Sequence, residues 1–238
     1  MKYTSLKKFI LIVLLLISKF NFSQNKINFG LKIHPNFSFS FVDNHSNLDQ
    51  KYFSLRQGLY GVNIGICSNL EIKKWLVELS LGLSTSKTGI HFKYYSDFAE
   101  INLRSVSVVN EINLGYKIYT SNNPIYDIYV TSSYSYNLIG VQGLSGGNRF
   151  VSFVGFEQEI PNIDLNWRSS TLGSGLKIRT QLKKGNKIDY GLSIHFALQK
   201  YPEIGFKIKY PTQTFSSSIQ PFVSNLNIDF IYYFKKIK

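Results

Sequence analysis

Few residues of this sequence combine the type and the spacing that chemistry requires. The four histidines, His34, His45, His91 and His195, are scattered along the chain, and Cys67 is the only cysteine. A metal site needs such ligands to cluster, and one cysteine can form neither an intramolecular disulfide nor a redox pair. The sequence therefore predicts no metal site and no thiol chemistry.

Two short motifs resemble catalytic loops but lack essential parts. Gly173-Ser174-Gly175 does not have the spacing of a nucleophile elbow, in which a further residue separates the serine from each glycine. The glycine-rich segment Gly143–Gly147 lacks the lysine, the following serine or threonine, and the helix of a phosphate loop. We therefore predict a protein that is not an enzyme, with no catalytic residues and no cofactor.

Another set of ionisable residues recurs at alternate positions, separated by apolar residues. Its members are Lys32, His34, Glu78, Glu111, Lys117, Asp127, Lys177, Arg179, Asp189, His195 and Asp229. Alternation places them on one face of successive β-strands, and we assign that face to the interior of a barrel. Buried charges persist only when they are paired and hydrogen-bonded. We therefore expect these lumen-lining charged residues to form ion pairs that fill a narrow lumen.

The positions of two turns suggest partners for four of these charges. Lys117 and Asp127 are symmetric about a turn at 120–124, and Arg179 and Asp189 are symmetric about a loop at 183–185. Residues directly opposed across a hairpin have Cβ atoms about 5 Å apart, which suits an ion pair.

His195 allows a different interpretation. Together with Ser193 and a carboxylate it could take a catalytic or transport role. Structural filling of the lumen is the interpretation that we favour for all these side chains.

The elements that must position these residues are β-strands. Eight stretches alternate with the period of two that indicates a strand, near 27–42, 54–69, 72–85, 103–119, 125–140, 167–182, 187–200 and 221–236. No stretch has the pattern of an amphipathic helix. A soluble barrel would bury the apolar face and expose a face rich in charges. Here the polar face is rich in Gly, Ser and Asn, and the apolar face is large and aromatic, as a lipid-facing band requires.

The fold class that we predict is all-β, an eight-stranded antiparallel up-and-down transmembrane β-barrel. Its connections alternate in length. Short turns are expected around Asn69–Leu70, at 121–124 and at 183–185, and long loops at 43–53, 86–102, 141–166 and 201–220. This alternation places the short turns in the periplasm and the long loops outside the cell. The faces of the two strands that flank 183–185 require a connection with an odd number of residues, which a three-residue loop with a left-handed Gly185 provides.

Aromatic residues gather near the expected turns and loop bases, where interfacial girdles lie in membrane barrels. These residues are Trp75, Tyr116, Tyr119, Tyr126, Trp167, Tyr190, Tyr232 and Phe234.

The beginning of the chain is typical of a secretion signal. Lys2, Lys7 and Lys8 precede an apolar run at 9–17, and Ser23 is a small residue at the expected cleavage point. We predict a signal peptide at 1–23 and one barrel domain at 24–238. The net charge of +13 could attract anionic lipid head groups, while export argues against nucleic acid as a partner.

Three segments are typical of a known family. They are Phe22-Ser23-Gln24, the opening strand with Phe29-Gly30-Leu31-Lys32-Ile33 and Asn36-Phe37-Ser38, and Glu111-Ile112-Asn113-Leu114-Gly115-Tyr116-Lys117. In these segments the sequence resembles the PorT-type outer-membrane β-barrel family of Bacteroidetes. The resemblance implies an eight-stranded outer-membrane barrel. Most members have no assigned activity, and the founding member assists a protein secretion system. The chain departs from such barrels by ending on Lys235-Lys236-Ile237-Lys238 instead of an aromatic residue.

The function that we expect is that of a non-enzymatic outer-membrane barrel that displays surface loops for ligand or partner binding. Its expected partners are outer-membrane lipid and lipopolysaccharide, the barrel assembly machinery, and envelope or secretion proteins. One alternative is an accessory subunit of a secretion or envelope-assembly system. Another is a lipid-modifying outer-membrane enzyme. A soluble barrel that carries a hydrophobic ligand would require the two faces to be reversed.

Overall fold

The computed structural model describes residues 27–42, 51–94, 97–122, 125–145, 155–159, 168–182, 185–200, 204–209 and 213–234. They form β1 (Ile27–Phe41), β2 (Phe53–Arg56), β3 (Leu59–Ile72), β4 (Trp75–Tyr94), β5 (Asp97–Asn122), β6 (Ile125–Ser145), β7 (Gly155–Glu159), β8 (Arg168–Gln181), β9 (Lys187–Ala197), β10 (Ile204–Lys209), β11 (Thr214–Ile219) and β12 (Phe222–Tyr233). The predicted signal peptide lies outside the described residues. No helix among the described residues is long and apolar enough to cross a membrane.

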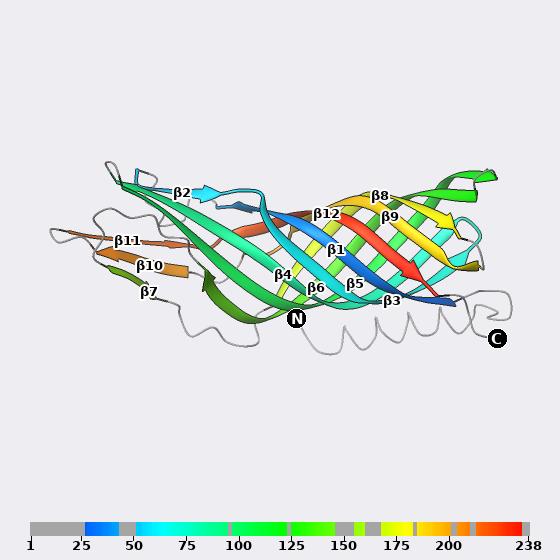
Figure 1. The fold of residues 1–238 in the computed structure, drawn as a ribbon, viewed down its shortest axis with the longest axis horizontal. Coiled ribbons are helices and arrows are strands. Elements are labelled where there is room, and N and C mark those ends of the chain that lie inside the picture. The colour runs from blue at the N-terminus through cyan, green and yellow to red at the C-terminus, as the bar shows by residue number, and fades with distance from the viewer. Residues whose placement is uncertain are drawn as a thin grey trace.

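Eight of these strands close into an antiparallel barrel (Figure 1). The order around the wall is β1, β3, β4, β5, β6, β8, β9 and β12, and β12 pairs with β1 to complete the ring. Every neighbour in the ring is also the next barrel strand along the chain, apart from that closing pair. The predicted eight-stranded up-and-down barrel is therefore confirmed.

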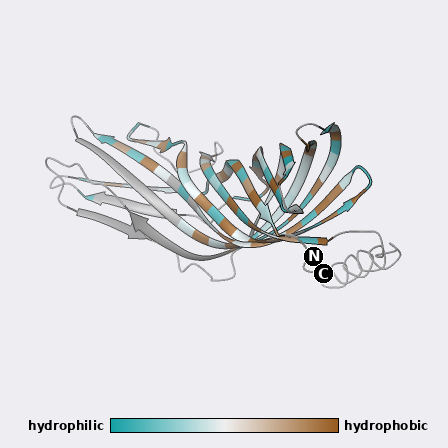
Figure 2. Cartoon of the chain, turned by 45° about the vertical axis from the view of Figure 1, so that its right-hand side comes forward, coloured by the Kyte–Doolittle hydropathy of each residue, from teal (hydrophilic) through white to brown (hydrophobic). Residues whose placement is uncertain are grey.

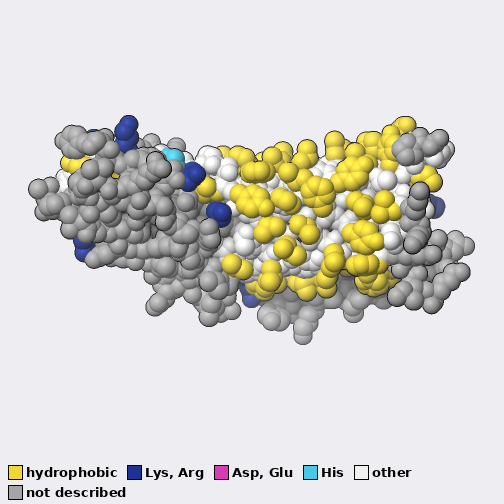
Figure 3. Space-filling view, viewed as in Figure 1, with side chains coloured by type: hydrophobic (Ala, Val, Ile, Leu, Met, Phe, Trp, Pro, Cys, Tyr) yellow, Lys and Arg dark blue, Asp and Glu magenta, His cyan; other side chains and the backbone are white. Residues whose placement is uncertain are grey.

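The two faces of the wall differ as the alternation predicts. On β1, Phe29 and Leu31 are 67% and 51% exposed, whereas Lys32 between Leu31 and Ile33 is 2% exposed. Bands of hydrophobic and hydrophilic residues accordingly alternate along the coloured strands of the barrel wall in Figure 2. In the space-filling view, apolar side chains are spread over the visible outer surface of the barrel as a broad belt (Figure 3). A surface of this kind is stable against hydrocarbon and not against water, so the barrel is of the transmembrane type.

The short turns lie at one end of the barrel. The prediction of a turn around Asn69–Leu70 is wrong, because β3 continues to Ile72 and pairs directly with Trp75. The turn is at Lys73–Lys74, where Lys73 has a positive φ of 56°. Asn69 remains in the ladder and accepts a hydrogen bond of 2.9 Å from the amide of Asn28.

The loop between β8 and β9 has the predicted form. Leu182 donates its backbone N–H to Asn186, which leaves three residues between them, and Gly185 has a φ of 83°. Such a left-handed residue in a three-residue hairpin loop favours glycine. At the third short turn, Asn122 pairs with Ile125, and residues 123–124 lie outside the described part of the chain.

Exposed and half-buried aromatic residues lie in contact near the turns at this end of the barrel. Trp75 contacts Tyr116 with ring centres 5.0 Å apart, Tyr119 lies 5.8 Å from Tyr126, and Tyr232 lies 5.3 Å from Phe234. These pairs belong to the predicted girdle. Trp167 of that set lies outside the described residues.

The opposite end is more ordered than predicted. Residues 86–102 were expected to form a loop, but β4 and β5 continue through them as one hairpin, with Tyr94 opposite Asp97. The expected loops at 141–166 and 201–220 likewise contain strand segments. The strand expected at 54–69 is divided into β2 and β3 at Gln57–Gly58, and most of the loop expected at 43–53 lies outside the described residues. β2 pairs with the outer part of β4, and β7, β10 and β11 form a three-stranded sheet in the order β11-β10-β7. We call β2, β7, β10, β11 and the outer parts of β4 and β5 the extension; it occupies the left half of Figure 1.

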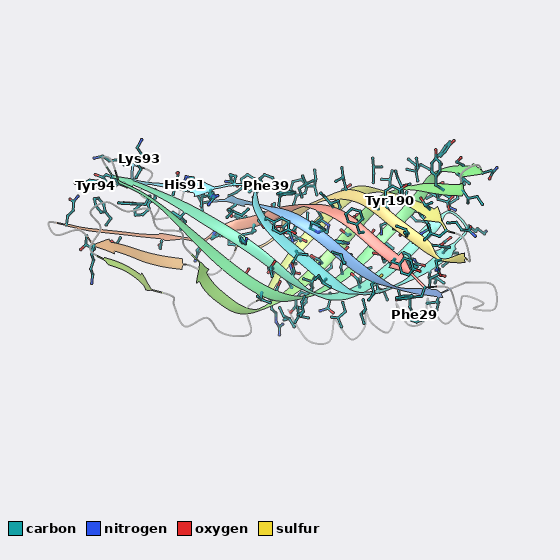
Figure 4. The ribbon with its side chains drawn as sticks, in the orientation of Figure 1. Phe29, Phe39, His91, Lys93, Tyr94 and Tyr190 are labelled. Atoms are coloured by element: carbon teal, nitrogen blue, oxygen red, sulfur yellow. The ribbon has the colours of Figure 1, made fainter. Side chains whose placement is uncertain are left out.

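An aromatic cluster joins the small sheet to the outer part of β4. Phe215 of β11 contacts Phe92, Tyr94 and Tyr52, with ring centres 5.4, 4.8 and 4.7 Å apart. Phe92 in turn contacts Phe53 of β2 at 5.0 Å, and both of these rings are buried. Figure 4 shows Tyr94, with His91 and Lys93, at the extension end, far from Phe29 at the turn end. These ring contacts therefore pack the small sheet and β2 against the outer part of β4, which is continuous with the barrel wall.

The pairing between β1 and β12 is interrupted near its middle. Ile33 pairs with Phe230 and Asn36 with Asn227, in unchanged register, but His34 and Pro35 have no ladder partner on β12. Proline has no N–H to donate to a ladder, which accounts for a break at this position. On the other side, Pro35 pairs with Val62 of β3. We call the β1–β12 pairing the closing seam.

Candidate functional site: the charged lumen

The structure places the sequence-predicted charged residues on the lumen side of the wall. Nine of them are buried: Lys32, His34, Glu78, Glu111, Lys177, Arg179, Asp189, His195 and Asp229. The other two, Lys117 and Asp127, are partly exposed at the turn end, with side chains 21% and 19% accessible. Exposed apolar residues alternate with these charged residues along the same strands, because successive side chains of a strand point to opposite faces.

Arg179 of β8 is the centre of the network at the turn end. It lies directly opposite Asp189 of β9, and its Nε and Nη2 donate to the two carboxylate oxygens at 2.7 and 2.6 Å. Its Nη1 donates to Glu71 at 2.5 Å, and Lys187 also bonds to Glu71. This forked pairing is the geometry in which a buried guanidinium is best satisfied.

Two tyrosine rings enclose the same guanidinium. The Arg179 Cζ atom lies 4.9 Å from the ring centre of Tyr233 and 5.7 Å from that of Tyr129. Both tyrosines are 1% exposed, as is Leu76. Cation–π contact adds to the ion pairs, and the bulky side chains fill the space around them.

A second set of charges extends this network across the lumen. Lys177 donates to Glu78 at 2.7 Å and lies 3.8 Å from Asp189. Lys32 donates to Glu111 at 3.0 Å and lies 3.7 Å from Glu78. Glu78 also accepts a hydrogen bond of 2.6 Å from the hydroxyl of Tyr233. These pairs connect β1, β4, β5, β8 and β9 from inside, so opposite parts of the wall are linked by charge.

Lys117 and Asp127 form the expected pair in a different geometry. Their charged atoms are 2.8 Å apart, but Asp127 lies opposite Thr120, which also donates to it at 2.7 Å. The register shifts between Lys117 and Tyr119. The turn itself displaces the two residues from direct opposition, because Asn122 pairs with Ile125 and this register places Asp127 opposite Thr120. The lysine side chain is long enough to reach back to the carboxylate.

His34, Asp229, Ser193 and His195 form a polar cluster beside the closing seam. His34 Nδ1 lies 3.1 Å from Asp229 Oδ1, Ser193 donates to the same oxygen at 3.4 Å, and His195 Nε2 lies 3.2 Å from Ser193 Oγ. A catalytic triad requires the imidazole between the hydroxyl and the carboxylate. Here the hydroxyl lies between the imidazole of His195 and the carboxylate, so the cluster lacks the order of groups that activates a serine.

Sequence reasoning missed three members of the network: Glu71, Tyr129 and Tyr233. Glu71 continues the inward-facing row of β3, but the strand was expected to end at position 69. Tyr129 and Tyr233 could have been predicted from the alternation, since Tyr129 lies two residues after Asp127 and Tyr233 four residues after Asp229, both of which were assigned to the lumen. Aromatic residues were considered only as members of the interfacial girdle, so these two tyrosines were not considered for the lumen.

Ion pairs, tyrosine rings and hydroxyl groups together occupy the interior of the barrel. Eight strands leave a lumen only wide enough for side chains, and the buried side chains described above lie in it. Among the residues that the structure describes, no group of three or more His, Cys, Asp or Glu is arranged to hold a metal ion. The arrangement can brace the wall from within, and it leaves the exterior and the extension as the surfaces that meet other molecules.

A closed barrel with a polar, charge-paired lumen and an exposed apolar belt is a transmembrane β-barrel. Solved structures similar in fold include OprG from Pseudomonas aeruginosa, at 14% identity and a TM-score of 0.38, covering 89% of this chain and 96% of that one. Neisserial surface protein A is 11% identical with a TM-score of 0.40, covering 87% and 97%. Ail, the attachment invasion locus protein of Yersinia pestis, is 12% identical with a TM-score of 0.35, covering 87% and 98%.

No protein-family model matches the sequence, and no curated protein matches it. The resemblance to the PorT-type family stays a prediction.

Proposed function

We propose that this protein is a non-enzymatic outer-membrane barrel that holds its extension outside the cell for binding a ligand or a partner protein. The observation that carries the proposal is the continuation of β4 and β5 beyond the apolar belt. The two strands remain paired to Tyr94 and Asp97, and they carry β2 and, through the aromatic cluster, the three-stranded sheet. A barrel serving only as a membrane anchor would need no such structure.

The side chains in the lumen favour display of the extension as the function, and not transport of a solute through the barrel. Lys32, Lys177 and Arg179 each bond to a carboxylate from another strand, and all three are at most 3% exposed. A solute would have to break these pairs in order to pass, and breaking a buried pair costs about 3–5 kcal/mol.

The apolar belt supports location in the outer membrane, after export directed by the signal peptide at 1–23. In this setting the partners that we propose are outer-membrane lipid and lipopolysaccharide at the belt, the barrel assembly machinery during insertion, and envelope or secretion proteins at the exposed ends. Nucleic acid is not among them.

Site-specific photo-crosslinking in living cells tests the display function. A photoreactive amino acid replaces Lys93, which is exposed in the extension, or Lys73, which is exposed in the turn between β3 and β4. We expect crosslinks to a discrete extracellular or surface component from position 93 and none from position 73. A discrete envelope protein captured from position 73 alone would contradict the display function and favour the accessory subunit of a secretion or assembly system.

Enzymatic modification of lipid needs a separate measurement. Purified protein is incubated with phospholipid and with lipid A, and the lipids are analysed by mass spectrometry. We expect no change in either lipid. A product that disappears in a Ser193→Ala or His195→Ala variant would overturn the non-enzymatic assignment.

A further inference from the structure

We propose that the outer wall of the barrel contains a binding groove for a membrane lipid with an ester- or amide-linked acyl chain. The groove has a volume of about 600 Å³ and crosses β1, β3, β4, β5 and β6. Its walls include Leu31, Ile66, Leu79, Leu81 and Ile112. All five lie in the exposed apolar belt, so the molecules that surround the groove are lipids. The inference rests on the membrane placement proposed above.

An unpaired amide marks this groove. Asn110 faces outward on β5 between Val108 and Ile112, and its side chain has no hydrogen-bond partner among the described residues. An amide in hydrocarbon without a partner is costly, and polar groups at lipid-facing positions are therefore associated with function. Tyr134 and Tyr136 line the groove beside it. The groove thus offers an amide and aromatic hydroxyls within an apolar wall.

The register shows how the groove runs along the wall. Asn110 lies opposite Tyr136 on one side and Leu81 on the other; Leu81 lies opposite Ile66, and Ile66 opposite Leu31. Neighbouring strands are about 4.8 Å apart and tilted, so each step from one strand to the next shifts the row by about 3 Å along the barrel axis. From Asn110 and Tyr136 the shift is toward the turn end, where Phe29 and Phe234 line the groove.

This geometry matches a lipid that enters from the extension side. Its acyl chain would lie between this row and the parallel row that contains Leu79 and Ile112, over roughly 19 Å from β6 to β1 at four strand spacings. The Asn110 amide would donate to the carbonyl of the acyl linkage, and its oxygen would accept from a hydroxyl or amide on the lipid. A hydrocarbon without a polar linkage would leave the amide unpaired.

The opposite wall provides an internal comparison. A larger groove of about 880 Å³ crosses β6, β8, β9 and β12, and it is lined by residues such as Leu176, Leu192, Ile194 and Phe230, with no amide side chain. If volume alone determined lipid binding, this second groove would bind more lipid than the first. If the amide determines it, the smaller groove binds more.

The test uses the full mature protein in nanodiscs that contain a photoactivatable diacyl phosphatidylethanolamine, with adducts mapped by mass spectrometry. We expect adducts to concentrate on the Asn110 groove. Asn110→Leu should lower adduct formation there by about three- to tenfold, the loss expected for one hydrogen bond within a membrane. Ser132→Val is the matched control, because Ser132 is also polar and outward-facing but lines neither groove. It should leave the adducts unchanged.

Further outcomes separate this inference from the proposed function. Asn110→Leu removes a polar group from the lipid face, so the barrel should still fold and show the gel shift of a closed barrel. Leu81→Trp should fill the groove and remove its adducts with Asn110 intact. Even labelling of both walls, unchanged labelling of Asn110→Leu, or equal labelling by a photoactivatable alkane would overturn the inference. Loss of the gel shift in the unmodified protein would instead contradict the membrane barrel itself.

Discussion

Removal of the Asp189 carboxylate should measure how much the charged lumen stabilises the barrel. Asp189 is completely buried and binds Arg179 with both oxygens, and it lies 3.8 Å from Lys177. Removing one member of a buried pair typically costs about 3–5 kcal/mol. Arg179 retains Glu71 and Lys177 retains Glu78, so neither cation is left without a partner. We therefore expect Asp189→Ala to lower the free energy of unfolding by about 2–4 kcal/mol.

The assay is urea unfolding in the presence of lipid vesicles, followed by tryptophan fluorescence. Asp189→Asn keeps the shape and one acceptor but removes the charge, so it should cost less than Asp189→Ala. A double-mutant cycle with Arg179→Met isolates the pair, and we expect a coupling free energy of about 2 kcal/mol, within the range for residues in contact. If both Asp189 variants unfolded like the wild type, the lumen would be hydrated enough to replace the pair, and the bracing role would be refuted.

Further predictions concern the faces, the lumen and the orientation. Leu192→Lys should destabilise the barrel by about 2–4 kcal/mol because it places a charge in the lipid. Ser193→Ala should cost only about 1 kcal/mol, because it removes a buried hydroxyl that contacts Asp229 and His195. A reversal of this order in urea unfolding would mean that the faces are inverted. In planar bilayers the protein should give no stable ion current, and large steady channels would contradict the filled lumen. A membrane-impermeant maleimide should label Lys93→Cys in intact cells and Lys73→Cys only after the envelope is opened, with the buried Cys67 silent throughout; the opposite result would reverse the topology.

Alternation of residue types was sufficient to predict the barrel because a two-sided wall requires it at every strand. The prediction of loops was wrong where the strands continue without alternating apolar and polar residues. Residues 84–89 read Ser-Thr-Ser-Lys-Thr-Gly, which resembles a loop, yet they continue β4 because β5 supplies partners for every one of them. Outside the belt, a strand is stabilised by pairing with its neighbour and needs no apolar face. The residue types there therefore give little indication that a strand is present.

The charged lumen was predictable within hairpins and not across them. Arg179 and Asp189 are ten residues apart around one short loop, so counting from the turn identified the pair. Glu78 and Lys177 are 99 residues apart, on strands that are not neighbours in the wall. Their contact depends on the stagger of the strands around the barrel, which the turn positions do not determine.

The closing seam has a consequence for how the chain reaches its final state. Every other pairing in the ring joins consecutive barrel strands and can form as the chain is delivered, while β1 and β12 stand at opposite ends of the sequence. The first strand must therefore wait with an open edge until the last one arrives. Where Pro35 interrupts the ladder, the side chains of His34 and Asp229 face each other across the two strands, with Nδ1 and Oδ1 3.1 Å apart. Because Asp229 belongs to the last strand, this contact forms only at the last step of assembly, when the wall is complete.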